Sequence, residues 1–292
     1  MIIWAIAKTT IGDAMRKKVI QIFLVVAVGL IVISLSFSQT LSFSTKAGSS
    51  TDLMLMKSFG YGLMAVAGLF ISLVMGVSLI PQEIERRTIY TILSKPVNRY
   101  EFIIGKFLGA AITLAINIGL MGIVFFAAIT LKALTAEAPA VNTAAGAVMD
   151  AGMHKIGIFD FNVIWGVILI YLQFLVLSGV VVLLSTFVAP TVNFFLGAGV
   201  YMLGTITPMT QTIAEHAQPG SMNPLIKGLY YILSCGYVIP NFDKFNVTNA
   251  LLHPEAHITN LGFYTFQMGL VAVLYVLLMM TLAVIVFWKK EV

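Results

Sequence analysis

"FNVIWGVILIYLQFLVLSGVVVLLSTFVAPTVNFFLGAGVYMLGTITPMTQTIA" occupies residues 161–214 and contains no Asp, Glu, Lys, Arg or His. The hydrocarbon core of a bilayer is ~30 Å thick, and ~20 apolar residues in helix cross it. The run is long enough for two such helices, with a break at Ala189-Pro190, because proline disfavours helix at the residue before it. This stretch therefore predicts an α-helical integral membrane protein.

The composition of the whole chain agrees with that class. Of its 292 residues, 59% are hydrophobic and 10% are charged, whereas soluble domains carry about 25% charged residues. Mean hydropathy is +0.98. No segment alternates apolar and polar residues as the ~10-residue strands of a membrane barrel do. We expect one all-α membrane domain over 1–292 with six transmembrane helices, at about 19–37, 59–80, 102–131, 162–188, 191–207 and 263–288.

The distribution of basic residues predicts the orientation, because cytoplasmic loops carry an excess of Lys and Arg. With both termini in the cytoplasm, eleven basic residues lie on the inner side and six on the outer side. The inner set is Lys8, Arg16, Lys17, Lys18, Arg86, Arg87, Lys95, Arg99, Lys106, Lys289 and Lys290; the outer set is Lys46, Lys57, Lys132, Lys155, Lys227 and Lys244. We therefore expect a multi-pass protein of the inner (cytoplasmic) membrane with both termini cytoplasmic.

Two further segments flank the spans. Residues 1–18 are expected to form an amphipathic elbow helix on the membrane surface, since the charge follows the apolar start rather than preceding it as in a cleaved signal peptide. Its apolar face would hold Ile3, Ile6, Ala7, Ile11 and Ala14, and its polar face Lys8, Asp13 and Lys17. Residues 215–262 form an extracytoplasmic region in which 225–239 is too short to span, and we expect a re-entrant hairpin there.

Charge is concentrated in one segment, "IPQEIERRTIYTILSKPVNRYEFIIGKF", at residues 80–107. Apolar residues from Ile89 to Tyr100 recur at three- and four-residue steps, which predicts an amphipathic helix. Pro96 then interrupts it, and Asn98 with Glu101 resembles a capping box that begins the third span. The helix either lies on lipid head groups or docks a cytoplasmic protein, and its mixed charge is compatible with a specific protein surface. The residues alone leave both alternatives open.

This segment resembles the connection between the second and third spans of type-2 ABC transporter permeases, the ABC-2 exporter family. Members commonly show an acidic residue, Glu-Arg-Gly-Thr, a Leu-rich stretch, Ser-x-Pro-Val-x-Arg and then Gly-Lys. The corresponding residues here are Glu83, Glu85 to Thr88, Ile92-Leu93, Ser94 to Arg99 and Gly105-Lys106. Arg87 departs from the pattern, because many relatives have glycine there. The surface helix, the six spans and "IPNFDKFNV" at 239–247 fit the resemblance less specifically.

The resemblance implies that residues 82–100 are a cytoplasmic coupling helix, held in a cleft of a separate ABC ATPase subunit. Two permease copies, identical or related, would pair with two ATPase chains. This chain has no phosphate-binding G-x-x-x-x-G-K-[ST] motif, so it is not expected to be an enzyme. It would hold no cofactor, and the partner would bind ATP and Mg. The residues expected to contact the ATPase are Glu83, Glu85, Arg86, Arg87, Thr88, Leu93, Pro96 and Arg99.

Several other functions compete less well. A membrane anchor that recruits a cytoplasmic protein and moves nothing is the main alternative. An ion-coupled transporter is disfavoured because no ionisable residue stands out deep in a span. The net charge of +5 does not indicate nucleic acid, since no basic patch contains interleaved aromatics. Membrane lipid is the other expected partner, and an uncharged interior favours an amphipathic or lipid-like cargo.

Polar residues outside the charged segment have ordinary explanations. His253 and His257 lack the zinc-binding H-E-x-x-H order, although Met149, Met153 and His154 could add soft ligands; we expect no metal. Cys235 has no partner for a disulfide. Polar residues within the spans more commonly bond between helices than line a path; they are Gln173, Ser178, Asn193 and Thr205. Gly197, Gly199 and Gly204 indicate close packing in the fifth span, at a dimer interface for instance.

Overall fold

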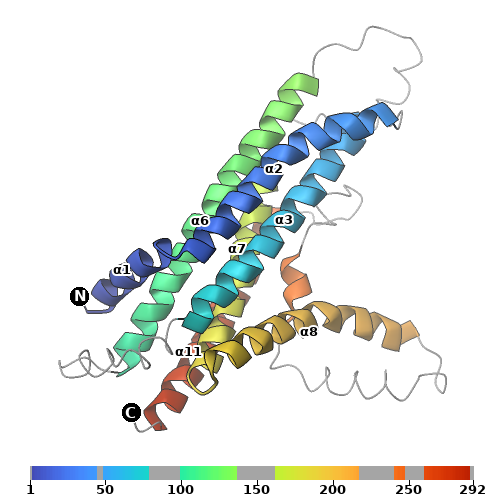
Figure 1. The fold of residues 1–292 in the computed structure, drawn as a ribbon. Helices are drawn as coiled ribbons and strands as arrows, with labels where there is room; N and C mark the ends of the chain where they lie inside the picture. Colours follow the sequence, from blue (N-terminus) through green and yellow to red (C-terminus); the bar gives the residue numbers. More distant parts are fainter. Residues whose placement is uncertain are drawn as a thin grey trace.

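The structure is a computed structural model that describes residues 2–44, 49–78, 99–136, 162–216, 240–246 and 260–289. In these ranges it contains α-helices and one 3-10 turn and no strand (Figure 1). The helices are α1 (Ile2–Met15), α2 (Lys18–Ser44), α3 (Ser49–Ser78), α6 (Arg99–Ala136), α7 (Asn162–Ser185), α8 (Pro190–His216) and α11 (Leu261–Lys289), and the 3-10 turn is η3 (Phe242–Phe245).

Four helices are each long and apolar enough to cross a membrane, and they lie in α3, α6, α7 and α11. The pair α1 and α2 passes the same test together, with a bend of 65° between its halves, which gives up to five spans in the described ranges. The apolar part of α8, Pro190–Ile206, is shorter than these. The all-helical membrane class is confirmed, at four to five spans by length and composition.

Helix α7 is the centre of the bundle. It carries no charged residue, and one whole half of it, from Gln173 to Val182, is largely buried. Glycines of α3 bring the two helices together: a Cβ at Gly68 would lie 2.5 Å from the Phe174 ring, and one at Gly76 would lie 2.6 Å from Val181. Small residues at such crossings are what let helices in a membrane approach closely.

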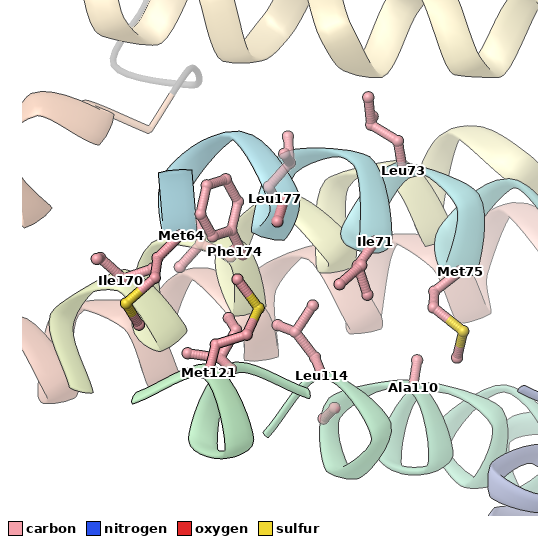
Figure 2. Close-up of a cluster of buried hydrophobic side chains, with 14 of the residues drawn as sticks. Met64, Ile71, Leu73, Met75, Ala110, Leu114, Met121, Ile170, Phe174 and Leu177 are labelled. Atoms are coloured by element: carbon pink, nitrogen blue, oxygen red, sulfur yellow. The ribbon is translucent and has the colours of Figure 1, made fainter. Parts of the chain in front are cut away.

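The apolar core lies where α3, α6 and α7 meet (Figure 2). The picture shows Ile71 of α3 pointing toward Leu114 of α6, and Met75 pointing toward Ala110. Met64 and Met121 approach each other nearer the other end of the two helices. These side chains are all buried, and the flexible thioethers fill the space between stiffer neighbours.

The break predicted at Ala189-Pro190 is confirmed. Helix α7 ends at Ser185, and α8 begins at Pro190, where a proline is favourable because its missing N–H has no partner in the first turn. Helix α8 then runs crosswise to α3 and α7 (Figure 1). Its contact with them is close, since a Cβ at Gly197 would lie 2.7 Å from Leu73 and 2.8 Å from Val181.

The turn η3 packs two aromatic rings against α7 and α8. Phe242 and Phe245 are almost fully buried, and the side chain of Asn241 accepts a hydrogen bond of 3.1 Å from the Asp243 amide to begin the turn. The Tyr264 hydroxyl of α11 donates a 2.6 Å hydrogen bond to the Lys244 carbonyl. The expected re-entrant hairpin at 225–239 lies outside the described residues.

One end of the bundle collects several elements that are far apart in sequence. The end of α3, the beginning of α6 and the end of α11 lie there together, and α1 lies beside α6 at the same end (Figure 1). The connection between Ser78 and Arg99 therefore starts and finishes at this end, which we call the α1 end.

Candidate functional site

The predicted coupling helix at 82–100 lies almost wholly outside the described residues, so its docking role stays a prediction. What the structure places is its two attachment points, the ends of α3 and α6. The residues expected to contact the ATPase that fall outside the described part are Glu83, Glu85, Arg86, Arg87, Thr88, Leu93 and Pro96. The eighth, Arg99, is the first residue of α6.

The start of α6 lies where the sequence predicts it, although Asn98 of the expected capping box lies outside the described residues. The helix begins at Arg99, directly after Asn98, and carries Glu101 in its first turn. A carboxylate there interacts favourably with the positive end of the helix dipole. From this point α6 continues for 38 residues without interruption. The segment before Arg99 is thus attached to one uninterrupted helix.

The first turns of α6 hold helix α1 in close contact. A Cβ at Gly105 would lie 2.9 Å from the Ile6 Cβ and 3.0 Å from the Ile3 carbonyl. A Cβ at Gly109 would lie 2.5 Å from the Thr10 Cβ and 2.9 Å from the Ala7 carbonyl. Because the α1 backbone itself occupies the space, only glycine permits this approach. We call Gly105 and Gly109 with their α1 neighbours the α1–α6 clamp.

The clamp gives the apolar face of α1 a neighbour that the sequence did not reveal. Ala7 and Ala14 are buried, Ile6 is half-buried, and Lys8 and Asp13 on the opposite face are exposed. The stripe assigned to the membrane surface therefore packs on protein for part of its length. The spacing Gly105-x-x-x-Gly109 is the small-x-x-x-small pattern of helix association and was the available signal.

Lys106 is buried at the same end of the bundle. Its side chain is only 6% exposed, and its ammonium lies 5.8 Å from the centre of the Phe102 ring one turn earlier. A cation at this distance from an aromatic face is attracted by the ring quadrupole. An ionisable residue this deeply enclosed in a membrane helix is a functional candidate by default, whereas from the sequence Lys106 was only part of a motif.

Two of the four polar residues that the sequence predicted to bond between helices do connect helices. The Gln173 side-chain amide of α7 donates to the Tyr201 hydroxyl of α8 at 3.3 Å. The Asn193 amide of α8 donates to the Val181 carbonyl of α7 at 3.2 Å. Ser178 and Thr205 bond back within their own helices. Among the described side-chain atoms, the Oδ1 oxygen of Asn193 is buried and has no hydrogen-bond partner.

Tyr201 offers a test of what holds α8 to α7. Its ring centroid lies 5.8 Å from that of Phe174 and 5.5 Å from that of Phe242. Tyr201→Phe keeps these contacts and removes only the hydrogen bond, so we expect a loss of about 0.6 kcal/mol. Tyr201→Ala removes the ring and should cost about 3 kcal/mol. The thermal unfolding midpoints of the two variants, measured in one detergent, compare the two losses of stability. Equal losses would show that the hydrogen bond, and not the packing of the ring, holds α8 to α7.

The glycines of the fifth expected span pack largely within the chain. Gly197 contacts Leu73 and Val181, and a Cβ at Gly204 would lie 2.5 Å from both the Phe242 ring and the Pro240 carbonyl. The space beside Gly197 and Gly204 is therefore filled by residues of the same chain, and these two glycines are not open to a second copy. Gly199 stays open, because a Cβ there would have nothing within 4 Å.

Metal ligation is not supported by the described residues, which contain no group of three or more His, Cys, Asp or Glu able to hold an ion. The residues weighed from the sequence, Met149, Met153, His154, His253 and His257, lie outside the described ranges. The site that the described residues do present is the α1–α6 clamp at the first turns of α6.

A family model described as ABC-2 family transporter protein matches residues 4–292. The chain belongs to that family. A search of the curated proteins finds no match. The resemblance drawn from residues 80–107 is thereby confirmed, and the match extends far beyond that segment. As an ABC-2 family protein the chain is a multi-pass membrane protein of the transport class, and its helices have the length and apolar character this requires.

Proposed function

We propose that this ABC-2 family protein is the permease half of an exporter driven by a separate ABC ATPase, which binds ATP and Mg and docks on residues 82–100. The observation that supports this is the position of the connection: it joins α3 to α6 at the α1 end and continues directly into the clamp (Figure 1). A partner that grips this segment acts on α6 at its first residue.

The clamp defines what moves with the coupling segment. Gly105 and Gly109 lock α1 onto α6 through backbone contacts, and packed interfaces shift between discrete arrangements rather than deforming continuously. Helix α1 and the first turns of α6 therefore move as one body. Nucleotide binding by the ATPase biases this body between two positions, which is how a distant ligand changes a conformational equilibrium.

The orientation follows from the charges of the described residues. The basic residues at the α1 end include Lys8 of α1, Arg16 and Lys17 of the turn that follows it, Lys18 at the start of α2 and Lys106 in the first turns of α6. We assign this end to the cytoplasm, because basic residues accumulate on that side. Both termini are then cytoplasmic and the membrane is the inner one.

The proposed permease has six membrane spans: the four in α3, α6, α7 and α11, together with α2 and α8. The apolar part of α8, Pro190–Ile206, is about 25 Å of helix, which is shorter than a ~30 Å hydrocarbon core, and α8 crosses α3 and α7 (Figure 1), so the sixth span is the least supported part of this proposal. The polar side chains of α7 and α8 form hydrogen bonds across their interface, which supports a cargo path outside the single bundle, between two permease copies. Helix α7 and the apolar part of α8 carry no charged residue and favour an amphipathic or lipid-like cargo, although Lys106 is buried in α6.

Copurification with the ATPase and assays of ATP hydrolysis test the proposal. If Glu85 and Arg86 each pair with a charge of the ATPase, Glu85→Ala and Arg86→Ala should each weaken association by about thirtyfold or more, because removing one member of a buried charge pair costs about 2–5 kcal/mol. Lys8→Ala is the matched control, since Lys8 is an exposed charge on α1 at the same end. If both coupling-segment variants bind and hydrolyse like wild type, the docking assignment is wrong. A membrane scaffold would bind its partner without any effect of cargo on hydrolysis.

A further inference from the structure

Three helices meet at the side chain of Val181, which belongs to α7 and is fully buried. A Cβ at Gly76 of α3 would lie 2.6 Å from one of its methyl carbons, Cγ1. A Cβ at Gly197 of α8 would lie 2.8 Å from the other, Cγ2. Because neither neighbour has a side chain, each methyl group of Val181 lies directly against the backbone of another helix.

Two further side chains complete this contact. Leu73 of α3 points away from α6 (Figure 2) and reaches α8, since a Cβ at Gly197 would lie 2.7 Å from its Cδ2. Asn193, one turn before Gly197 on α8, donates its side-chain N–H to the Val181 carbonyl at 3.2 Å. We call Leu73, Gly76, Val181, Asn193 and Gly197 the Val181 junction.

Asn193 is an unfavourable residue for packing alone. Its side chain is completely buried, and its Oδ1 oxygen has no hydrogen-bond partner. The penalty for a buried acceptor without a partner exceeds the net gain from one hydrogen bond, so an apolar side chain of similar size would be at least as stable here. Positions at which a residue lowers stability in this way are commonly functional. What Asn193 does provide is a fixed link between α8 and one carbonyl of α7.

The Val181 junction lies beside the start of the connection that carries the coupling segment. Gly76 is two residues before Ser78, where α3 ends, and the connection begins at the next residue. Close-packed interiors are hardly compressible and transmit a displacement from one side chain to the next. Since both methyl groups of Val181 are already in contact, a shift of α3 at Gly76 leaves no free space to absorb it before α8.

We propose that Val181 and Asn193 are positioning residues that carry movement of the end of α3 to α8. The inference rests on the proposed function, because the movement begins at the coupling segment. A displacement of Gly76 presses on Val181, and the first turns of α8 follow through Gly197 and the Asn193 hydrogen bond. Helix α8 therefore changes position with the nucleotide state of the ATPase, by a route separate from the α1–α6 clamp.

One fluorescent reporter on α8 and another on α6 test the proposal. Phe195 of α8 and Leu108 of α6 are both exposed; each is replaced by Cys in a Cys235→Ser chain and labelled with bimane, in the complex with the ATPase in nanodiscs. ATP with vanadate traps the nucleotide-bound state, and we expect the emission of both reporters to shift. A silent α6 reporter would overturn the proposed function and this inference with it. A silent α8 reporter beside a responding α6 reporter would overturn this inference alone.

Val181→Ala opens free space between Gly76 and Gly197. It should reduce the nucleotide response of the α8 reporter by about fivefold, a typical size for a residue that couples two sites, and leave the α6 response unchanged. Val182→Ala is the matched control, because Val182 is equally buried and its side chain points about 100° away around α7. Equal reductions in the two variants would mean that general loosening of α7, and not the junction, sets the response, and the proposal would fail.

Asn193→Leu separates positioning from stability. The new side chain fills a similar space without a polar atom, so the thermal unfolding midpoint should be equal to that of the wild type or higher. The α8 response should nevertheless fall about as far as in Val181→Ala, because the link to the Val181 carbonyl is lost. A lower midpoint with an intact α8 response would show that Asn193 only holds the fold together, and would contradict the role assigned to it.

Discussion

Gly109→Leu should detach α1 from α6 and uncouple ATP hydrolysis from transport. The new side chain would begin 2.5 Å from the Thr10 Cβ and 2.9 Å from the Ala7 carbonyl, and the backbone atom cannot move without moving the whole of α1. Inserting bulk into a packed contact costs about 1–3 kcal/mol. We expect the upper end of that range and a thermal midpoint lower by several degrees, together with ATPase activity that cargo no longer stimulates.

Gly12→Leu is the control for this substitution. Gly12 lies on α1 itself, yet a Cβ there has nothing within 4 Å, so its replacement should stay within about 0.5 kcal/mol of wild type. Protease accessibility of residues 2–15, measured in nanodiscs, reports detachment directly. If α1 in the Gly109 variant is as protected as in the control, the clamp does not hold α1 and the mechanism built on it fails.

Phe242→Ala should loosen α8 from the rest of the bundle. Phe242 is completely buried; its ring packs against Gly204 and lies 5.5 Å from the Tyr201 centroid. Removing a buried phenyl group costs about 3–5 kcal/mol because a cavity remains. The loss should fall on α8, since Gly204 and Tyr201 both belong to it. Hydrogen exchange of peptides from 190–206 should accelerate by more than that of α7.

Lys244→Ala provides the comparison in the same turn. The Lys244 side chain is exposed, while its backbone carbonyl, which accepts the Tyr264 hydrogen bond, survives the substitution. Exchange in α8 should be unchanged in this variant. Equal acceleration in α7 and α8 for the Phe242 variant would show that the ring stabilises the bundle as a whole and not the position of α8.

The features that the sequence predicted well depend on local signals. The absence of charge over 161–214 marked α7 and the apolar part of α8, and Pro190 marked the break between them. Asn98 with Glu101 placed the start of α6 within one residue. Each of these signals acts within one or two turns of helix, so no tertiary information was needed to use it.

The features that the sequence missed depend on which helices meet. The apolar stripe of α1 is equally compatible with lipid and with a protein neighbour, and only the position of Gly105 and Gly109 decides between them. Likewise the glycines of α8 indicated close packing but not the partner, which is Leu73, Val181 and Phe242 of the same chain. The close contact at Gly122 likewise involves Val167, which lies 45 residues further along the chain. Contacts of this kind cannot be predicted from periodicity alone.

The length of α6 has a mechanical consequence. Its 38 residues make a helix of about 57 Å, nearly twice the ~30 Å of hydrocarbon that it crosses. A stiff member of that length behaves as a lever with its short arm gripped by α1. If a partner moves Arg99 as proposed above, a tilt of a few degrees at that end would displace Ala136 by several ångström.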